Sequence, residues 1–454
     1  MSARRLARLL ESKFLKDSAT LQVSALLNQL SQIVSSVVIA FLLGSHGQGL
    51  FFLAIALQAL FYNLVNVGVM QATVTQVAAA SVREARTKVA GWLAFLVKSH
   101  VLFSTLLIGL GWVVLPALAR ASYAEKLGPQ AAAQLGLWAW WLTFWPLLDT
   151  PRAVAQVAFQ GTRRMLRLGQ LDNGCELMRM FLVTTGALIT ASPEGAILGE
   201  IVSRVFGTLL AVSMYRAARR EGESWLPSPR EVLRMIRVVP LRQGIRLGLR
   251  VGLLKNSQTL FMDVLPGLIL GRLAGASWVA YYKLATRITI LPFTMLQGVG
   301  RTILPALSEL RGLRDLDRFR SLYYRSSLIS GGLVVGALLV LVPLIPPFVG
   351  ALFPPDYKEP VFHYSWILAL GMVPPAFAVG MDAFYILTDQ MKRNLVLMGI
   401  GAALTIPTFF YLVAVLPETG VAWGLSLYRS WTLVHFAYVA WYFRHRARRG
   451  HWDR

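Results

Sequence analysis

Two stretches of sequence decide the fold: LLNQLSQIVSSVVIAFLLG at Leu26–Gly44 and LLKNSQTLFMDVLPGLILG at Leu253–Gly271. They align without gaps, and each is long and apolar enough to cross a bilayer as a helix. Further matches at nearly the same offset pair Gly195 with Gly420, Gly199 with Gly424, and Arg204 with Arg429. We therefore expect two halves related by duplication, with a substrate site between parallel repeats.

The composition is that of a membrane protein. Of the 454 residues, 56% are apolar and 15% are charged, and the mean hydropathy is +0.55. An average soluble domain has about 25% charged residues, so a disordered chain or an ordinary soluble enzyme is excluded. Unpaired backbone groups are not tolerated in lipid, so each apolar span should be a helix. The twelve expected spans are 21–43, 49–78, 91–117, 135–159, 170–191, 195–216, 248–270, 278–306, 322–350, 361–387, 393–416 and 420–443.

The fold class that follows is all-α, a polytopic membrane protein with twelve transmembrane helices in two repeated six-helix bundles. We place the first bundle at 1–216, a basic cytoplasmic linker at 217–247 and the second bundle at 248–454. In the linker, Arg230, Arg234 and Arg237 fall on one helical face beside apolar residues. This pattern predicts either an interfacial helix on anionic membrane lipids or a solvated linker.

The basic residues orient the chain and explain its net charge of +23. With the N-terminus inside, 31 of the 45 Lys and Arg residues fall in cytoplasmic segments and four fall outside. This asymmetry is a positive-inside signal and needs no nucleic-acid partner. We predict a multi-pass protein of the cell (inner or cytoplasmic) membrane with both termini in the cytoplasm. The single cysteine, Cys175, excludes an internal disulfide.

No pattern typical of an enzyme occurs in the sequence. It has no phosphate-binding G-x-x-x-x-G-K-[ST] loop, no metal-ligand spacing among its six histidines, and no nucleophile, base and acid set. We expect no catalytic residue, no metal and no cofactor. A coupling ion, H⁺ or Na⁺, stays open.

Several charges within the spans have local explanations. Glu200 and Arg204 are four residues apart, and Glu176 and Arg179 are three apart, so each pair can meet on one helix. Two other sets resist this reading. The first is a pair of polar stripes at i, i+4 and i+8, which the repeat should bring face to face: Lys255, Thr259 and Asp263 in the seventh span, and Asn28, Gln32 and Ser36 in the first.

The second set is Lys283 and Arg287, two like charges one turn apart in the eighth span, before a helix break expected at Pro292. Like charges at this spacing destabilise a helix unless an anion lies between them. The first half has Ala56 and Leu60 at the equivalent positions, so the fold does not require these charges. Three readings stay open: binding of an anionic headgroup, pairing with Asp263 or Asp382, and exposure at the outer rim.

Three motifs add a resemblance to a known family. The G-x-x-x-x-G-L-F turn at Gly44–Phe51, the Q-G-x-x-R turn within Ala158–Met165 and the G-x-x-x-G opening at Gly420–Gly424 resemble those of the polysaccharide flippases. These belong to the multidrug/oligosaccharidyl-lipid/polysaccharide exporter superfamily. The resemblance implies two bundles that alternate between inward-open and outward-open states. It also implies export of polyprenyl-pyrophosphate-linked oligosaccharides for a surface polysaccharide.

On this resemblance, Lys255, Lys283 and Arg287 would hold the pyrophosphate, in a cleft whose only stripe acid is Asp263. Sugar hydroxyls would contact the polar side chains Asn28, Gln29, Gln32, Asn63 and Asn66. Asn63 and Asn66 serve equally well as interhelical hydrogen-bonding residues. A polysaccharide polymerase and glycosyltransferases are the expected protein partners. The alternatives are a multidrug/cation antiporter of the same superfamily, a membrane glycosyltransferase, and a non-transporting scaffold in polysaccharide synthesis.

Overall fold

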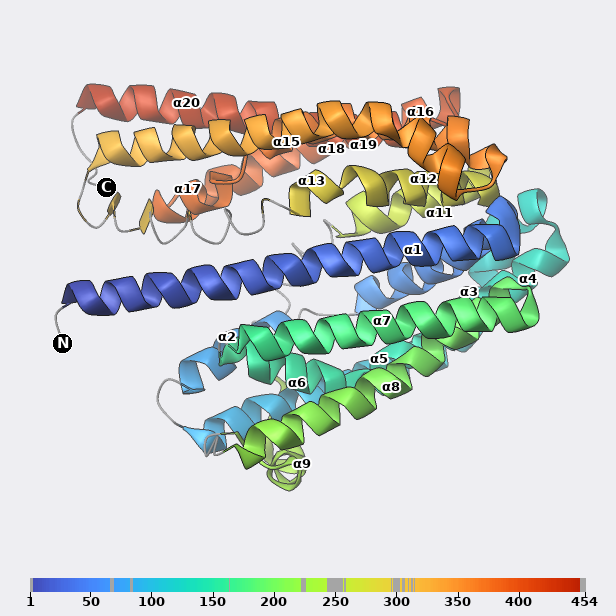
Figure 1. Cartoon of the computed structure of the whole chain (residues 1–454), viewed down its shortest axis with the longest axis horizontal. Coiled ribbons are helices and arrows are strands. Elements are labelled where there is room, and N and C mark those ends of the chain that lie inside the picture. The colour runs from blue at the N-terminus through green and yellow to red at the C-terminus, as the bar shows by residue number, and fades with distance from the viewer. Residues whose placement is uncertain are drawn as a thin grey trace. The chain divides into compact units, whose positions relative to one another are not determined.

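A computed structural model shows an entirely helical chain in its described residues (Figure 1). These are 3–65, 69–81, 85–162, 164–221, 226–242, 256, 259–294, 296, 303, 307–308, 310–311, 313 and 315–449, with side chains described from residue 22 to residue 445 except 64, 65 and 71. The chain divides into two compact units, Met1–Ala280 and Tyr281–Arg454. The boundaries predicted from the sequence stay a prediction.

The first unit opens with α1, a long helix that covers the first predicted span and much of the second. It is kinked at Gly44, whose backbone lies at φ 65° and ψ 178°, a conformation that glycine adopts at little cost. Helices α7 and α8 form an antiparallel pair and lie side by side in Figure 1. The main helices of this unit up to the linker are α1 (Ala3–Val65), α2 (Val69–Ser81), α3 (Arg86–Leu127), α4 (Pro129–Trp141), α6 (Thr150–Gly161), α7 (Met165–Thr190) and α8 (Pro193–Arg220).

Close backbone contact holds α7 against α8. A Cβ atom added at Gly195 would lie 2.2 Å from the carbonyl oxygen of Gly186, and one at Gly199 would lie 2.3 Å from that of Leu182. The second half repeats this packing, because a Cβ at Gly420 would lie 2.2 Å from the carbonyl oxygen of Leu412. Glycine is therefore needed at the matching positions of both halves for the same reason, which is the close approach of two helices.

The fourth and seventh predicted spans are broken into short helical pieces. Between α4 and α6 lie η1 (Leu142–Phe144) and α5 (Trp145–Leu148). Proline lacks the N–H that an unbroken helix needs, and Pro146 and Pro151 fall in this region. In the seventh span a π-helical turn, η2 (Leu260–Val264), leads directly into α11 (Leu265–Leu273).

A short helix, α9 (Pro229–Val238), forms within the basic linker. Ser228 begins it with a capping box, in which the Glu231 N–H donates to the Ser228 hydroxyl and the Ser228 N–H donates to the Glu231 carboxylate. Val232 is buried among residues of α2, α3 and α6. Glu231 also accepts hydrogen bonds from Arg86 at 2.8 Å. These hydrogen bonds lower the pKa of Glu231 below its usual value. The bonds from Arg86 have the larger effect, and the bond from the Ser228 N–H has the next largest.

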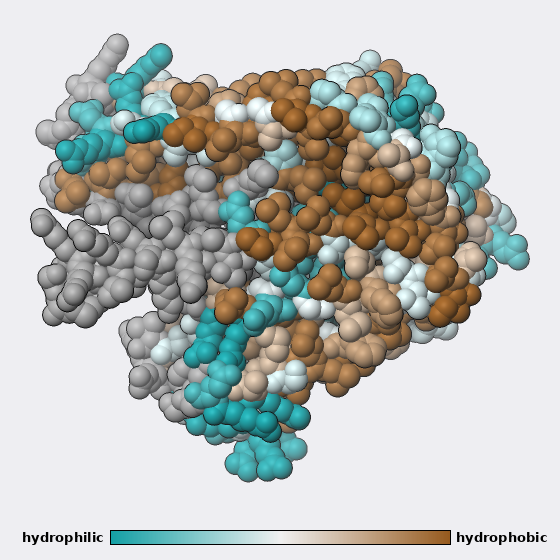
Figure 2. All heavy atoms as spheres, in the orientation of Figure 1, coloured by the Kyte–Doolittle hydropathy of each residue, from teal (hydrophilic) through white to brown (hydrophobic). Residues whose placement is uncertain are grey.

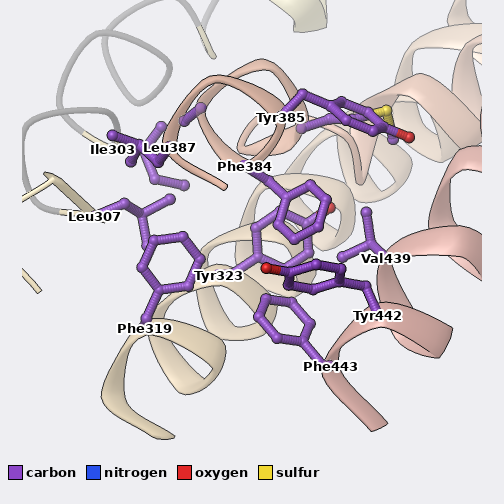
Figure 3. Packing of buried hydrophobic residues seen from close by; sticks show 12 residues of the cluster. Ile303, Leu307, Phe319, Tyr323, Phe384, Tyr385, Leu387, Val439, Tyr442 and Phe443 are labelled. Atoms are coloured by element: carbon purple, nitrogen blue, oxygen red, sulfur yellow. The ribbon is translucent and has the colours of Figure 1, made fainter. Parts of the chain in front are cut away.

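The second unit contains most of α12 (Ala276–Thr289) and the helices that follow it. Helix α12 ends just before the expected break, and α13 (Leu291–Thr294) carries Pro292. A cluster of aromatic rings from α15, α17 and α20 fills one part of the interior (Figure 3). The later helices are α15 (Leu316–Leu352), η3 (Pro355–Tyr357), α16 (Lys358–Ala376), α17 (Met381–Leu387), α18 (Met391–Val415), α19 (Gly420–Ser430) and α20 (Thr432–Arg449).

Six stretches of the described chain are long and apolar enough to cross a membrane: Gln22–Asn63, Arg86–Leu127, Pro193–Arg220, Leu316–Leu352, Pro355–Leu387 and Met391–Val415. Many large hydrophobic side chains on them are exposed, as expected of helices that face lipid. On the face drawn in Figure 2, hydrophobic residues cover the middle of the helices and hydrophilic residues gather at their ends and over α9. The prediction of an all-α, multi-pass membrane protein is confirmed.

Candidate functional site

The eighth predicted span carries the two basic residues singled out from the sequence. On α12, Lys283 and Arg287 are both partly exposed, and Thr286 is the third partly exposed residue of the same turn. The residues around them, including Tyr282 and Leu284, are buried. Lys283, Thr286 and Arg287 lie at i, i+3 and i+4, so they share one face. The two cations therefore form the only polar, accessible strip on the part of α12 that belongs to the second unit.

The first span presents amide side chains along α1. Asn28, Gln29 and Gln32 are all partly exposed, and the Oε1 atom of Gln29 is buried without a hydrogen-bond partner. Below them the hydroxyl of Ser36 donates to the carbonyl oxygen of Gln32 at 2.8 Å. Gln48, beyond the kink, donates to the carbonyl oxygen of Ser36 at 2.8 Å. Ser36 is thus used within the helix, while the three residues Asn28, Gln29 and Gln32 before it are partly exposed.

The first unit brings the seventh span against α1. Asn256 donates a side-chain hydrogen bond to the carbonyl oxygen of Asn63 at 3.0 Å, and the Asn63 amide donates to the carbonyl oxygen of Ala59 at 2.8 Å. The Asn63 side chain therefore bonds within its own helix, while its backbone carbonyl oxygen accepts the bond from Asn256. Asn66 and Lys255 lie outside the described residues.

Thr259 and Asp263 flank the π-helical turn of the seventh span. Thr259 precedes η2, and Asp263 is exposed within it. A π-turn inside a helix is uncommon and frequently accompanies a functional site. It stays a prediction that Thr259 and Asp263 face the amide side chains of the first span. The role of every residue in the proposed binding set also stays a prediction.

The sequence missed a buried network of charges in the first unit, which we call the N-terminal charge network. It consists of two clusters that share α7, one of Asp149, Arg152, Gln156 and Asp172 and one of Glu176, Arg179, Glu200 and Arg204. The local pairs expected from the sequence are present, since Arg179 contacts Glu176 at 2.6 Å and Arg204 pairs with Glu200. The links between helices were not expected.

Arginines make those interhelical links. Arg179 of α7 also reaches Glu200 of α8 at 3.2 Å. Arg152 of α6 lies 3.5 Å from Asp149 and 3.6 Å from Asp172 of α7. The only sequence signal for the link from Arg179 to Glu200 was that the stretches of α7 and α8 both carry acids and arginines.

An aromatic ring completes one end of the network. The Arg204 guanidinium stacks over the Trp145 ring, 3.6 Å from its centroid, in a cation–π contact. The network contains four carboxylates and three arginines, so its formal charge is −1. Because its arginines already contact carboxylates, this network is a poor receptor for a pyrophosphate.

Comparison with known proteins gives a family. The sequence pattern of the family described as "Polysaccharide biosynthesis protein" matches residues 14–311, well over half of the chain. A curated relative, the probable flippase AglR of Haloferax volcanii, is 25% identical over 201 residues, which span 43% of this chain and 37% of that protein. The chain therefore matches little more than a third of that relative's length.

Solved structures with the same fold are transporters. An inward-facing multidrug resistance MATE family transporter of the MOP superfamily has a TM-score of 0.70 at 17% identity, covering 93% of this chain and 96% of its own. An outward-facing MATE conformation has a TM-score of 0.61 at 15% identity, covering 96% and 97%. A MOP superfamily transporter from Pyrococcus furiosus, whose report describes reverse polarity of its binding pocket, has a TM-score of 0.61 at 16% identity, covering 95% and 96%. Because this fold is known both inward-facing and outward-facing, it supports alternating access.

Proposed function

The chain belongs to the polysaccharide biosynthesis protein family and has the fold of MOP-superfamily membrane transporters, and on that premise we propose that it flips a lipid-linked oligosaccharide. The substrate is a polyprenyl-pyrophosphate-linked oligosaccharide, which moves from the cytoplasmic to the outer leaflet for surface polysaccharide synthesis. The observation that carries the proposal is the strip of Lys283 and Arg287 on α12.

The chemistry of the strip suits a pyrophosphate. Two like charges one turn apart repel each other, and a doubly charged anion between them removes that repulsion. Arg287 offers paired donors that match phosphate oxygens, and Lys283 offers a point charge on a flexible stem. The partner of this pair in the proposal is the pyrophosphate, while the neutral amides of Asn28, Gln29 and Gln32 suit sugar hydroxyl groups.

The direction of transport has a physical basis. The headgroup enters from the cytoplasmic side while its polyprenyl tail stays in lipid, so only the polar part crosses the membrane. With the cell interior negative, each negative charge that moves outward gains about 2.3 kcal/mol per 100 mV. Export of an anionic headgroup is therefore favoured by the membrane potential, whether or not H⁺ or Na⁺ is also coupled. A polymerase and glycosyltransferases acting on the same lipid carrier would be its partners in the cell membrane.

A second candidate, a multidrug/cation antiporter, draws support from the N-terminal charge network. That network carries one more carboxylate than arginines, and an excess of buried negative charge attracts cations. The two functions differ in which charges matter. An anion flippase depends on Lys283 and Arg287, and a cation antiporter depends on the acids.

The deciding experiment measures flipping of a fluorescent polyprenyl-pyrophosphate oligosaccharide in liposomes that contain the purified protein. Losing the hydrogen bonds of a charged group costs about 1.5–3 kcal/mol, so Arg287→Ala should weaken headgroup binding about 10- to 150-fold. Arg287→Lys should retain part of the activity, and the double variant with Lys283→Ala should have none. Arg318→Ala is the matched control, because this arginine of the same unit is exposed and pairs only with Asp315.

The outcomes separate the candidates. Loss of flipping in the α12 variants, with normal yield and a normal control, supports the flippase. Normal flipping by the double variant excludes these two residues as the headgroup site. Proton-driven efflux of a cationic dye from the same liposomes, unchanged in the α12 variants, would favour the antiporter instead.

A further inference from the structure

A groove lies between α3 and α9 in the first unit, away from the proposed substrate strip. Its volume is about 290 Å³. The walls are mainly apolar, with one cation at the rim, and the lining residues include Lys88, Gly91, Trp92, Phe95, Met235 and Val239. Phe95 is fully buried and forms part of the floor, while Lys88 is exposed.

Two polar contacts at either end of α9 hold this groove in place. Near its start, Arg86 binds both carboxylate oxygens of Glu231 at 2.8 Å. Past its end, the Lys98 ammonium donates to the carbonyl oxygen of Val239 at 3.0 Å. The helix therefore runs alongside the first three turns of α3, and the groove is a fixed feature of the first unit.

The charge around the groove is positive. Lys88 is the one cation among the lining residues, and α9 carries the exposed arginines Arg234 and Arg237 on its face away from Met235 and Val239. The one acid of α9, Glu231, is already bound by Arg86. A ligand that fits this rim must carry negative charge next to an apolar part, because the walls below the rim are hydrophobic.

The apolar part of such a ligand has further apolar surface along α3. At 3.6 residues per turn, Gly91, Lys98, Leu102 and Leu106 fall on one helical face. Past Lys98, whose ammonium is held by the Val239 carbonyl oxygen, this face is apolar and accessible, since Leu102 is 49% and Leu106 is 47% exposed. A chain that extends beyond the groove would pass the Lys98 side chain and reach this surface.

We propose that this groove binds an anionic phospholipid of the cytoplasmic leaflet. The phosphate lies at Lys88 within the field of the α9 arginines, and an acyl chain lies between Gly91, Trp92 and Met235. Snorkelling basic residues beside apolar grooves recognise lipids by this combination. The bound lipid links α9 to α3, so it stabilises the linker on the first unit. This inference does not depend on the substrate proposed above.

The test uses the full-length protein in neutral detergent with added phosphatidylglycerol, phosphatidylcholine or inorganic phosphate. Native mass spectrometry counts the lipids retained, and thermal unfolding reports stabilisation, because a ligand of the folded state raises the melting temperature. Gly91→Leu fills the groove. Gly91→Ala is its control, since a Cβ there would meet Met235 at 3.7 Å and Val239 at 3.9 Å, both ordinary contacts. Lys88→Ala removes the rim cation, and Lys126→Ala removes an exposed lysine at the other end of α3.

We expect the wild type and both controls to retain phosphatidylglycerol in preference to phosphatidylcholine. Lys88→Ala should bind phosphatidylglycerol about fivefold more weakly, which corresponds to about 1 kcal/mol for one basic residue at an anionic surface. Gly91→Leu should lose the lipid altogether. Equal retention of both lipids, unchanged binding in Lys88→Ala, or the same stabilisation by inorganic phosphate alone would each overturn the proposal. Lys88 is exposed, so its variant keeps the test valid even where Gly91→Leu fails to fold.

Discussion

The N-terminal charge network makes a quantitative prediction about Arg179. Its guanidinium contacts Glu176 at 2.6 Å and Glu200 at 3.2 Å, and the three side chains are only 11%, 15% and 2% exposed. Replacing Arg179 by Met leaves Glu176 without its arginine in a region of low dielectric constant. Breaking a buried pair from one side costs about 3–5 kcal/mol. Arg179→Met should therefore lower the free energy of unfolding by about that amount and reduce the yield of protein in the membrane.

A matched pair tests whether burial, rather than contact distance, sets this cost. Arg86 contacts Glu231 at 2.8 Å, but the two side chains are 40% and 42% exposed. Exposed pairs are worth about 0.2–1 kcal/mol, so Arg86→Met should cost no more than that. The double variant Glu176→Met/Arg179→Met should recover most of the stability, because it removes the uncompensated carboxylate while Glu200 keeps Arg204.

The assay is equilibrium unfolding in mixed detergent micelles, with membrane yield measured in parallel. Equal losses in Arg179→Met and Arg86→Met would show that burial does not strengthen the contact. A double variant as unstable as Arg179→Met would show that the cost comes from lost packing of the arginine rather than from an unpaired acid. Either result would refute the electrostatic account of the network.

Three further predictions follow from single features. Gly199→Ala should sharply reduce folded protein in a detergent melting assay, because its Cβ would lie 2.3 Å from a backbone oxygen, whereas Gly109→Ala, with nothing within 4 Å, should be silent. The lowered pKa of Glu231 means that its contribution to stability is full above its unfolded pKa of about 4.5 and is lost as the pH falls through the lower folded value. The protection factor for hydrogen exchange in α9, which divides out the intrinsic exchange rate at each pH, should therefore fall below about pH 4.5 and stay constant between about pH 6 and 8. A membrane-impermeant thiol reagent should label a cysteine introduced at Lys126 from outside the cell, and one introduced at Arg234 only from inside. The opposite labelling pattern would reverse the topology.

Much of the fold could be predicted because its signals are local or periodic. Apolar length predicts a spanning helix, and the basic loops predict orientation. The acid and base spacing of Glu176 with Arg179 also predicted a contact that is present. The link from Arg179 to Glu200 could not be predicted in this way, because it depends on how α7 packs against α8. Glycines such as Gly199 allow that packing. Their spacing in the sequence predicts that two helices lie close together, but it does not predict how each helix is rotated about its own axis.

The seventh span shows a second limit of prediction. A stripe at i, i+4 and i+8 assumes one regular helix, but η2 turns through π-helical geometry before Pro266 and changes the angle between successive side chains. The helix break near Pro292 was predictable, since it follows from the missing proline N–H. A π-turn has no comparable marker in the sequence. The placement of Thr259 and Asp263 therefore needed the structure, while that of Lys283 and Arg287 on one face did not.

The repeat itself supplies an argument about which charges serve transport. Gly195 and Gly420 are matched because both bring two helices into contact, so a purely structural requirement explains their recurrence in the two halves. A residue that the fold required should recur in the same way. Lys283 and Arg287 do not recur, since Ala56 and Leu60 stand at their equivalents.

Under the proposed function, an anion that visits the site during each transport cycle accounts for this asymmetry. The comparison of the two halves therefore makes Lys283 and Arg287 the first residues to replace in a test of that proposal.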